Sequence, residues 1–187
     1  ADMLAATLTV TPQRVLEMTA SMPLHTVNEM LIQHEQSPTI TSINGLAGKS
    51  VHARKSSAYW QTLKRIQAQV PSLKLVAAPE TDETEVLIHK VQRGQIPLTV
   101  ADFDIAAVEL AFGGRIKASL VLAEGRERAY WVRSESPKLL AEVNRFVQSQ
   151  RVLKGRNRGP GTKSTKTKTA PPAQSKSEHI KLHTPFD

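Results

Sequence analysis

Strand-like and helix-like segments alternate through residues 51–122, and this order limits the possible folds more than any other pattern in the chain. Short apolar runs are followed there by stretches whose apolar residues recur every three or four positions. The order is strand, helix, strand, helix, strand, helix, strand. It predicts an α/β domain in which a mostly parallel sheet is covered by helices.

One predicted helix begins at Ser56 and Ser57, directly after a predicted strand at residues 50–54. Its apolar residues share one helical face because their spacing is four, three and four: Tyr59, Leu63, Ile66 and Val70. Free backbone N–H groups, two hydroxyls and the positive end of the helix dipole meet at such a start and favour a bound anion. The alternative is an ordinary helix cap, since serine is a preferred cap on any helix.

Other polar residues also follow predicted strands. Ligands of open α/β sheets bind beyond the carboxyl ends of the strands, and Asp102 occupies such an end together with the serine pair. Nearer the N-terminus, threonine alternates with apolar residues over residues 7–11, and Arg14 follows. These residues predict either a half-exposed strand with a solvated charge, or hydroxyls and a guanidinium that together hold a carboxylate.

The formal charge of +8 is concentrated at the C-terminal end. Residues 151–187 contain nine Lys and Arg against two acidic residues, so they carry +7 and leave +1 for residues 1–150. Because this segment is rich in Gly, Pro, Thr, Ser and Lys, we predict a disordered basic tail. Nucleic-acid binding is not favoured, because aromatic residues for base stacking are missing from the basic stretch. His179 and His183 are four residues apart and could share a metal ion only if this segment were helical. No metal site or cofactor is therefore predicted.

Several classes of protein are excluded by composition. The chain has no cysteine, which removes a disulfide framework and thiolate chemistry. It has no run of about eighteen apolar residues, so no membrane-spanning helix is expected. The opening residues Ala1, Asp2 and Met3 read as the interior of a longer protein, and we expect a fragment.

The residues carry a resemblance to a known family. Residues 6–14 (ATLTVTPQR) resemble the segment of the periplasmic solute-binding proteins for amino acids in which a Thr-x-Thr-x-x-Arg pattern holds the ligand carboxylate. Residues 46–49 with the serine pair resemble the start of the second lobe of that family, and residues 100–102 resemble its aspartate-bearing strand end.

A narrower resemblance is to the solute-binding-like module of the F-type membrane-bound lytic murein transglycosylases. The resemblance covers about residues 1–150. It is carried by the order and spacing of four segments, which are residues 51–60, 98–102, 129–133 and 136–140. The resemblance implies a two-lobed, hinged α/β fold with one complete lobe and part of the other. The implied divisions are a remnant of the first lobe at residues 1–25, a crossing at 26–44 and the complete second lobe at 45–125. A return crossing with a helix follows at residues 126–150, and the tail at 151–187.

The same resemblance implies a set of ligand contacts. Thr9 and Arg14 would meet a ligand carboxylate from the first lobe, and Arg54, Ser56 and Ser57 would meet it from the second. Asp102 would hold the ligand's ammonium group. The expected partner is therefore a small zwitterion, an amino acid or a muropeptide.

The family's lytic chemistry has no counterpart in these residues. A lytic domain needs a Glu-Ser pair on a helix followed by a Gly-rich segment, whereas Glu135 and Ser136 directly precede Pro137 and predict a helix start. We therefore expect a non-catalytic periplasmic module that senses a ligand for an attached lytic transglycosylase. The alternatives are a receptor that delivers an amino acid to a membrane permease and a basic-tailed nucleic-acid-binding protein.

Overall fold

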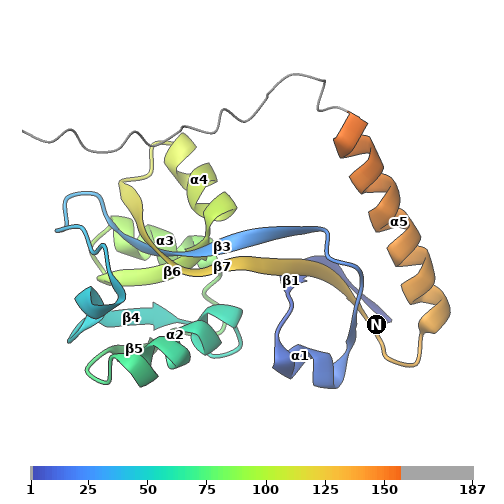
Figure 1. The fold of residues 1–187 in the computed structure, drawn as a ribbon. Coiled ribbons are helices and arrows are strands. Elements are labelled where there is room, and N and C mark those ends of the chain that lie inside the picture. The colour runs from blue at the N-terminus through green and yellow to red at the C-terminus, as the bar shows by residue number, and fades with distance from the viewer. Residues whose placement is uncertain (1, 157–187) are drawn as a thin grey trace, which may run out of the picture.

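A ribbon of two long antiparallel strands, β3 (His25–His34) and β7 (Ile116–Val132), runs through the middle of the protein (Figure 1). The computed structural model describes residues 2–156. The remaining strands are β1 (Met3–Thr9), β2 (Thr19–Ala20), β4 (Ser50–Ala53), β5 (Lys74–Ala77) and β6 (Leu98–Asp102). The helices are α1 (Pro12–Glu17), α2 (Ala58–Gln69), α3 (Thr84–Gln92), α4 (Phe103–Ala111) and α5 (Pro137–Arg156), with a 3-10 turn η1 (Ile43–Leu46).

The strands form one seven-stranded sheet in the order β1-β7-β3-β6-β4-β5, with β2 paired to β7 as well. Only the pairs β4–β5 and β4–β6 are parallel, while β3 runs antiparallel to both β6 and β7. The sheet is therefore mixed, and the predicted mostly parallel sheet is wrong. The reason is that β3, which precedes the alternating region, inserts between two of its strands in the opposite direction.

The strand β7 also differs from the sequence expectation. The alternating region was expected to end with a strand by residue 122, and residues 126–150 were assigned to a return crossing with a helix. The structure instead has one strand of 17 residues. The charged part keeps its pairing, since Arg126 and Arg128 lie opposite Val27 and His25 of β3. Neighbouring strands thus override the weak strand preference of this stretch.

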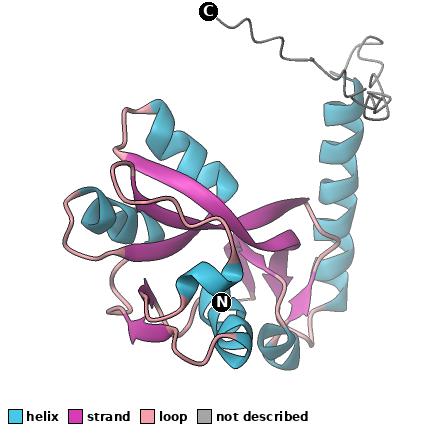
Figure 2. Cartoon of the chain, turned by 60° about the vertical axis from the view of Figure 1, so that its left-hand side comes forward, coloured by secondary structure: helices cyan, strands magenta, loops and turns pink. Residues whose placement is uncertain are grey.

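Apolar residues of β3 supply cores on both faces of the sheet because successive side chains of a strand point to opposite sides. Leu31 is fully buried in a core shared with Leu63 of α2 and Val100 of β6. Its neighbour Ile32 lies in the opposite core, with residues of α3 and α4. Helices therefore cover both faces of this end of the sheet (Figures 1 and 2), and the predicted apolar face of α2 is confirmed.

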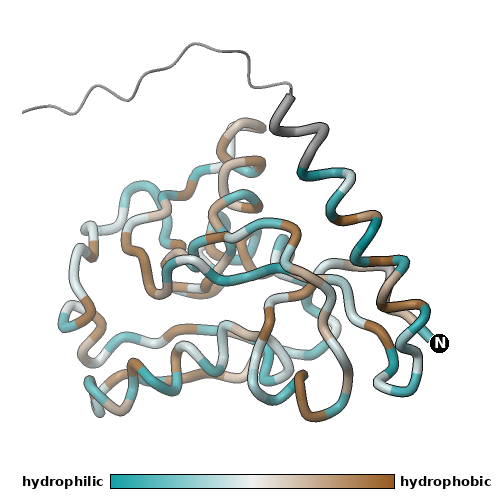
Figure 3. Tube along the Cα trace, turned by 45° about the vertical axis from the view of Figure 1, so that its right-hand side comes forward, coloured by the Kyte–Doolittle hydropathy of each residue, from teal (hydrophilic) through white to brown (hydrophobic). Residues whose placement is uncertain are grey.

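A smaller unit lies at the other end of the ribbon, where β1 and β2 pair with β7 and where α1 and α5 are found (Figure 1). Val132 of β7 packs there with Val143 and Val147 of α5. Apolar residues recur every three or four positions along this part of α5, between polar ones (Figure 3), so that one side of the helix faces the cluster. Trp131 is fully buried, and its indole N–H donates to the carbonyl of Leu8 at 3.3 Å.

The last helix ends at Arg156, so residues 151–156 of the predicted disordered tail are helical. The rest of that prediction, with His179 and His183, lies outside the described residues. Within residues 2–156, none of the helices has the length and apolar content needed to cross a membrane. The same residues contain no group of three or more potential ligands that could hold a metal ion.

Candidate ligand-binding site

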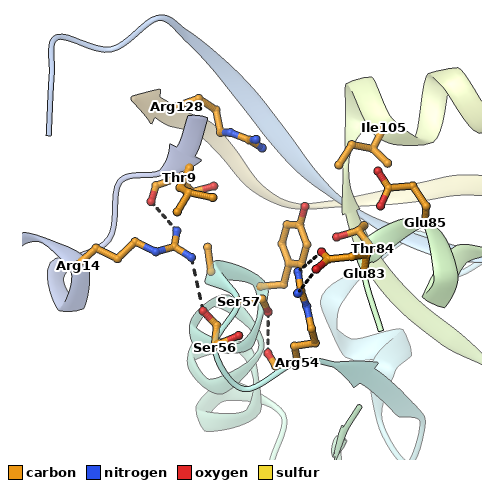
Figure 4. Close-up of a pocket in the computed structure, with 13 residues that line it drawn as sticks. Thr9, Arg14, Arg54, Ser56, Ser57, Glu83, Thr84, Glu85, Ile105 and Arg128 are labelled. Atoms are coloured by element: carbon orange, nitrogen blue, oxygen red, sulfur yellow. Dashed lines mark hydrogen bonds and ion pairs between the residues drawn. The ribbon is translucent and has the colours of Figure 1, made fainter. Parts of the chain in front are cut away.

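A pocket of about 410 Å³ lies between the β1–α1 segment and the first turns of α2 and α3 (Figure 4). Its lining is dominated by charged and hydroxyl side chains, with a few apolar ones. The polar and charged members are Thr9, Arg14, Arg54, Ser56, Ser57, Tyr59, Glu83, Thr84, Glu85 and Arg128. Five of the six residues predicted from the sequence therefore line one pocket, and Asp102 is not among them.

The arginine of the N-terminal segment is held by the local fold of α1. Thr11 caps this short helix, because its hydroxyl accepts from the backbone N–H of Arg14 at 3.4 Å. The Arg14 guanidinium donates to the carbonyl of Thr9 at 2.8 Å and reaches the carbonyl of Ser56 across the pocket at 3.5 Å. Arg14 thus bridges the two walls, as Figure 4 shows.

The electrostatic surroundings of Arg14 are positive. Burial, followed by the charge of Arg128 and of two further arginines, lowers the pKa of the Arg14 guanidinium. Among the described residues, its side-chain donors meet backbone carbonyls and form no ion pair with a carboxylate. A half-buried guanidinium without an acidic partner favours an anion in the space beside it.

The serine pair at the start of α2 has two different roles. The hydroxyl of Ser57 is the helix cap, accepting from the N–H of Trp60 at 3.3 Å and donating to the carbonyl of Arg54 at 2.7 Å. Ser56 is exposed and its hydroxyl donates to Glu80 at 2.5 Å. The cap interpretation therefore describes Ser57, while Ser56 binds a carboxylate.

That carboxylate belongs to the chain itself. One oxygen of Glu80 accepts from the backbone N–H groups of Lys55 at 3.0 Å and Ser56 at 3.4 Å. The hydrogen bond from the Ser56 hydroxyl is the main cause that lowers the pKa of Glu80. The turn before α2 can therefore hold a carboxylate, as the sequence predicted for an anion, although here the anion is a side chain.

The third wall of the pocket carries acidic groups. Arg54, at the end of β4, makes a two-pronged contact with the carboxylate of Glu83, with both N–O distances at 2.9 Å. Glu83 is the residue before α3, and Glu85 lies in the first turn of that helix. Arg54 is therefore paired with an acidic residue, whereas Arg14 donates only to backbone carbonyls of the described residues.

Asp102 lies at the end of a strand, as expected, but its side chain is in a different environment from the one expected. It ends β6 directly before α4, but its side chain is fully buried and makes no cap hydrogen bond. One carboxylate oxygen accepts from Arg128, which also donates to the carbonyl of Thr7 at 2.7 Å. The other oxygen has no hydrogen-bond partner among the described residues. Burial raises the pKa of Asp102 to about 6, against the lowering effect of Arg128.

A second buried pair lies beside the first. Glu29 of β3 is opposite Asp102 in the sheet, is fully buried, and accepts from Arg126 at 3.1 Å. Two carboxylates from β3 and β6 thus face two arginines from β7. Tyr59 of α2 closes the group, since its hydroxyl accepts from the backbone N–H of Asp102 at 3.2 Å, and burial raises the pKa of its phenol.

Sequence reasoning missed Arg128, Glu80 and Glu83. Arg128 lies in residues 126–150, which the resemblance assigned to a return crossing with a helix. Once the beginning of that range is recognised as part of a strand, period two puts Arg126 and Arg128 on one face. Glu80 follows β5, a neighbour of β4 in the parallel part of the sheet, so the strand-end rule that selected the serines would have selected it too.

No protein-family model matches the chain. Among curated proteins, the membrane-bound lytic murein transglycosylase F of Desulfosudis oleivorans is 35% identical over 145 residues, which are 78% of this chain and 32% of that protein. The protein of the same name from Pseudomonas putida is 29% identical over 146 residues, or 76% of this chain and 30% of that protein. The chain therefore spans about a third of the length of these relatives.

Solved structures of amino-acid-binding proteins share the fold. The substrate-binding protein of an amino acid ABC transporter matches with a TM-score of 0.71 and 18% identity, covering 84% of this chain and 68% of that one. An ancestral arginine-binding protein bound to arginine matches with a TM-score of 0.67 and 18% identity, covering 78% and 63%. The α/β solute-binding fold is thereby confirmed, in its mixed-sheet form, and so is the resemblance from which it was predicted.

Proposed function

We propose that this chain, which is related to the solute-binding-like module of the F-type lytic murein transglycosylases, binds a small amino-acid-like or muropeptide ligand through its carboxylate. In this proposal it is a non-catalytic module located in the periplasm and associated with a cell-wall lytic transglycosylase. The observation that carries the proposal is the pocket around Arg14, whose guanidinium has no carboxylate partner among the described residues.

The chemistry of the pocket supports a carboxylate ligand. Arg14 offers the planar fork that matches a carboxylate, and Arg128, which is paired with Asp102, lines the same pocket with its guanidinium. The turn before α2 already holds the carboxylate of Glu80 with two N–H groups and a hydroxyl. A ligand carboxylate would lie against Arg14 and Thr9 and displace or join Glu80 at Ser56.

The position of the pocket supports binding by closure. One wall, Thr9 and Arg14, belongs to the unit at one end of the β3–β7 ribbon, and the opposite wall, Arg54 to Ser57, belongs to the unit at the other end. Bending of the ribbon would change the width of the pocket, and a ligand held by both walls would favour the closed form. We propose residues 26–44 and 126–134 as the crossings in which this motion occurs, between a first-lobe remnant at residues 1–25 and a second lobe at 45–125.

A receptor for a membrane permease is the second candidate. The observation in its favour is the fold match to the substrate-binding protein of an amino acid ABC transporter. The two candidates share the ligand site and differ in what the module is attached to. A lytic domain in the same open reading frame would support the first, and an open reading frame that ends after α5 would support the second.

The test of the proposed function is a thermal-shift screen of amino acids and muropeptides on the chain, followed by calorimetry. We expect at least one carboxylate compound to raise the melting temperature, and Arg14→Ala to weaken its binding by about tenfold or more, the value of one charge-assisted contact. Arg145→Ala is the matched control, because Arg145 is exposed on α5 and pairs with Glu142. Failure of every compound to bind, or equal binding by Arg14→Ala, would contradict the proposal.

A further inference from the structure

We propose that Arg128 makes the pocket selective for carboxylates whose α-nitrogen carries no charge, such as N-acylated amino acids and peptides, over free amino acids. This inference rests on the proposed function and specifies its ligand class. It is based on the ion pair between Arg128 and Asp102, because the Asp102 carboxylate was expected to bind the ligand's ammonium and is instead bound to Arg128.

The arrangement of the two side chains blocks the way to Asp102. Arg128 lines the pocket and is 19% exposed, whereas Asp102 is 0% exposed and does not line it. Arg128 is fixed at two points, by the Asp102 carboxylate and by the carbonyl of Thr7. Figure 4 shows Arg128 beside Thr9, with its guanidinium directed towards the Ile105 side of the pocket. A ligand ammonium could reach Asp102 only by displacing this guanidinium.

Such a displacement brings no gain in charge pairing. An ammonium would replace one positive partner of Asp102 by another, and the released guanidinium would move towards Arg14. These two arginines already act on each other, since the charge of Arg128 contributes to the lowered pKa of Arg14. As long as Arg128 stays in place, the ammonium of a free amino acid therefore has no access to Asp102 as a partner and lies beside a guanidinium.

An acylated nitrogen meets no such obstacle. It carries no charge, and its acyl oxygen can accept from the guanidinium hydrogens of Arg128 that Asp102 and Thr7 leave unused. The acidic residue Glu85 lies at the exposed rim of the pocket, where it can meet a basic side chain of the ligand. The proposed selectivity therefore concerns the charge of the α-nitrogen and sets no requirement on the side chain of the ligand.

The test compares matched ligand pairs by calorimetry near neutral pH. The probes are L-glutamine with N-acetyl-L-glutamine and L-arginine with N-acetyl-L-arginine, since ancestral proteins of this fold have been solved with glutamine and with arginine. For the wild-type chain we expect the acetylated member to bind about tenfold tighter or more. For Arg128→Ala, which opens the route to Asp102, we expect the preference to fall or to reverse. Arg115→Ala, on an exposed arginine paired with Glu35, should keep the wild-type preference.

The outcomes separate this inference from the proposed function. Tighter binding of the free amino acids by the wild-type chain would overturn the role of Arg128 and leave the proposed function standing. An acetyl preference that survives in Arg128→Ala would show that the acetyl group is favoured for its apolar contacts, and would also overturn it. If Arg128→Ala does not fold, Arg128→Gln, which removes the charge and keeps most of the side chain, replaces it with the same expected and contradicting results. Absence of binding by all four probes and by muropeptides would overturn both proposals.

Discussion

Replacing Asp102 by asparagine should remove a pH dependence from the stability of the chain. Two opposed effects act on this carboxylate: burial disfavours its charge, and the ion pair with Arg128 favours it. The outcome is a pKa raised from the ordinary 3.8 to about 6, so burial is the stronger effect. The folded chain then binds a proton at Asp102 more tightly than the unfolded chain does, and protonation stabilises the fold.

The size of the effect follows from the shift. A difference of about two pKa units corresponds to about 3 kcal/mol at full protonation. Between about pH 7 and about pH 5, the free energy of unfolding of the wild type should rise by about 1 kcal/mol relative to Asp102→Asn. The gain should be complete below the unfolded-state pKa and should be lost as the pH rises through 6.

Urea denaturation followed by tryptophan fluorescence measures this difference, because Trp131 is fully buried and becomes exposed on unfolding. The other titrating groups are common to both proteins and largely cancel in the comparison. Glu142→Gln, which removes an exposed carboxylate on α5, should keep the pH dependence of the wild type. A wild type that loses stability relative to Asp102→Asn as the pH falls would refute the reasoning, because it would mean that the ion pair outweighs burial.

Three further substitutions test the fold. Leu63→Ala should lower the free energy of unfolding by about 3 kcal/mol in urea, because the side chain is fully buried between α2 and the sheet. Gly114→Ala should lower the melting temperature by several degrees, since a Cβ there would lie 2.7 Å from the carbonyl oxygen of Glu109; an unchanged melting temperature would show that this turn can shift freely. Arg126→Met should cost about 3–5 kcal/mol by leaving the buried carboxylate of Glu29 without a partner, and adding Glu29→Gln should recover part of that loss in a double-mutant cycle.

Local patterns were enough to find most of the pocket. The spacing of Leu63 and Ile66 revealed the buried face of α2, and the serine pair marked its first turn. Arg14 and Thr9 came from one short segment that carries a family pattern. These features depend on residues a few positions apart, which is the range over which helix periodicity, caps and motifs act.

Features that depend on distant partners were not found in the same way. The direction of β3 is set by β6 and β7, which follow it by more than sixty residues, and nothing in its own apolar run indicates that direction. The pairing of Arg128 with Asp102 joins residues 26 positions apart on two strands that are not neighbours in the sheet. The sequence could therefore place Asp102 at a strand end but could not show that its carboxylate is ion-paired with Arg128.

The pairing of β1 with β7 has a consequence for how the protein is made. Met3 lies opposite Val132, so the first strand finds its partner only after nearly all of the described chain has left the ribosome. Until β7 has been made, β1 lacks the strand it pairs with in the described sheet, and contacts of such long sequence separation form slowly. Release of the chain before β7 is complete would therefore leave β1 and β2 without the strand they pair with in this sheet, and exposed strand edges favour aggregation.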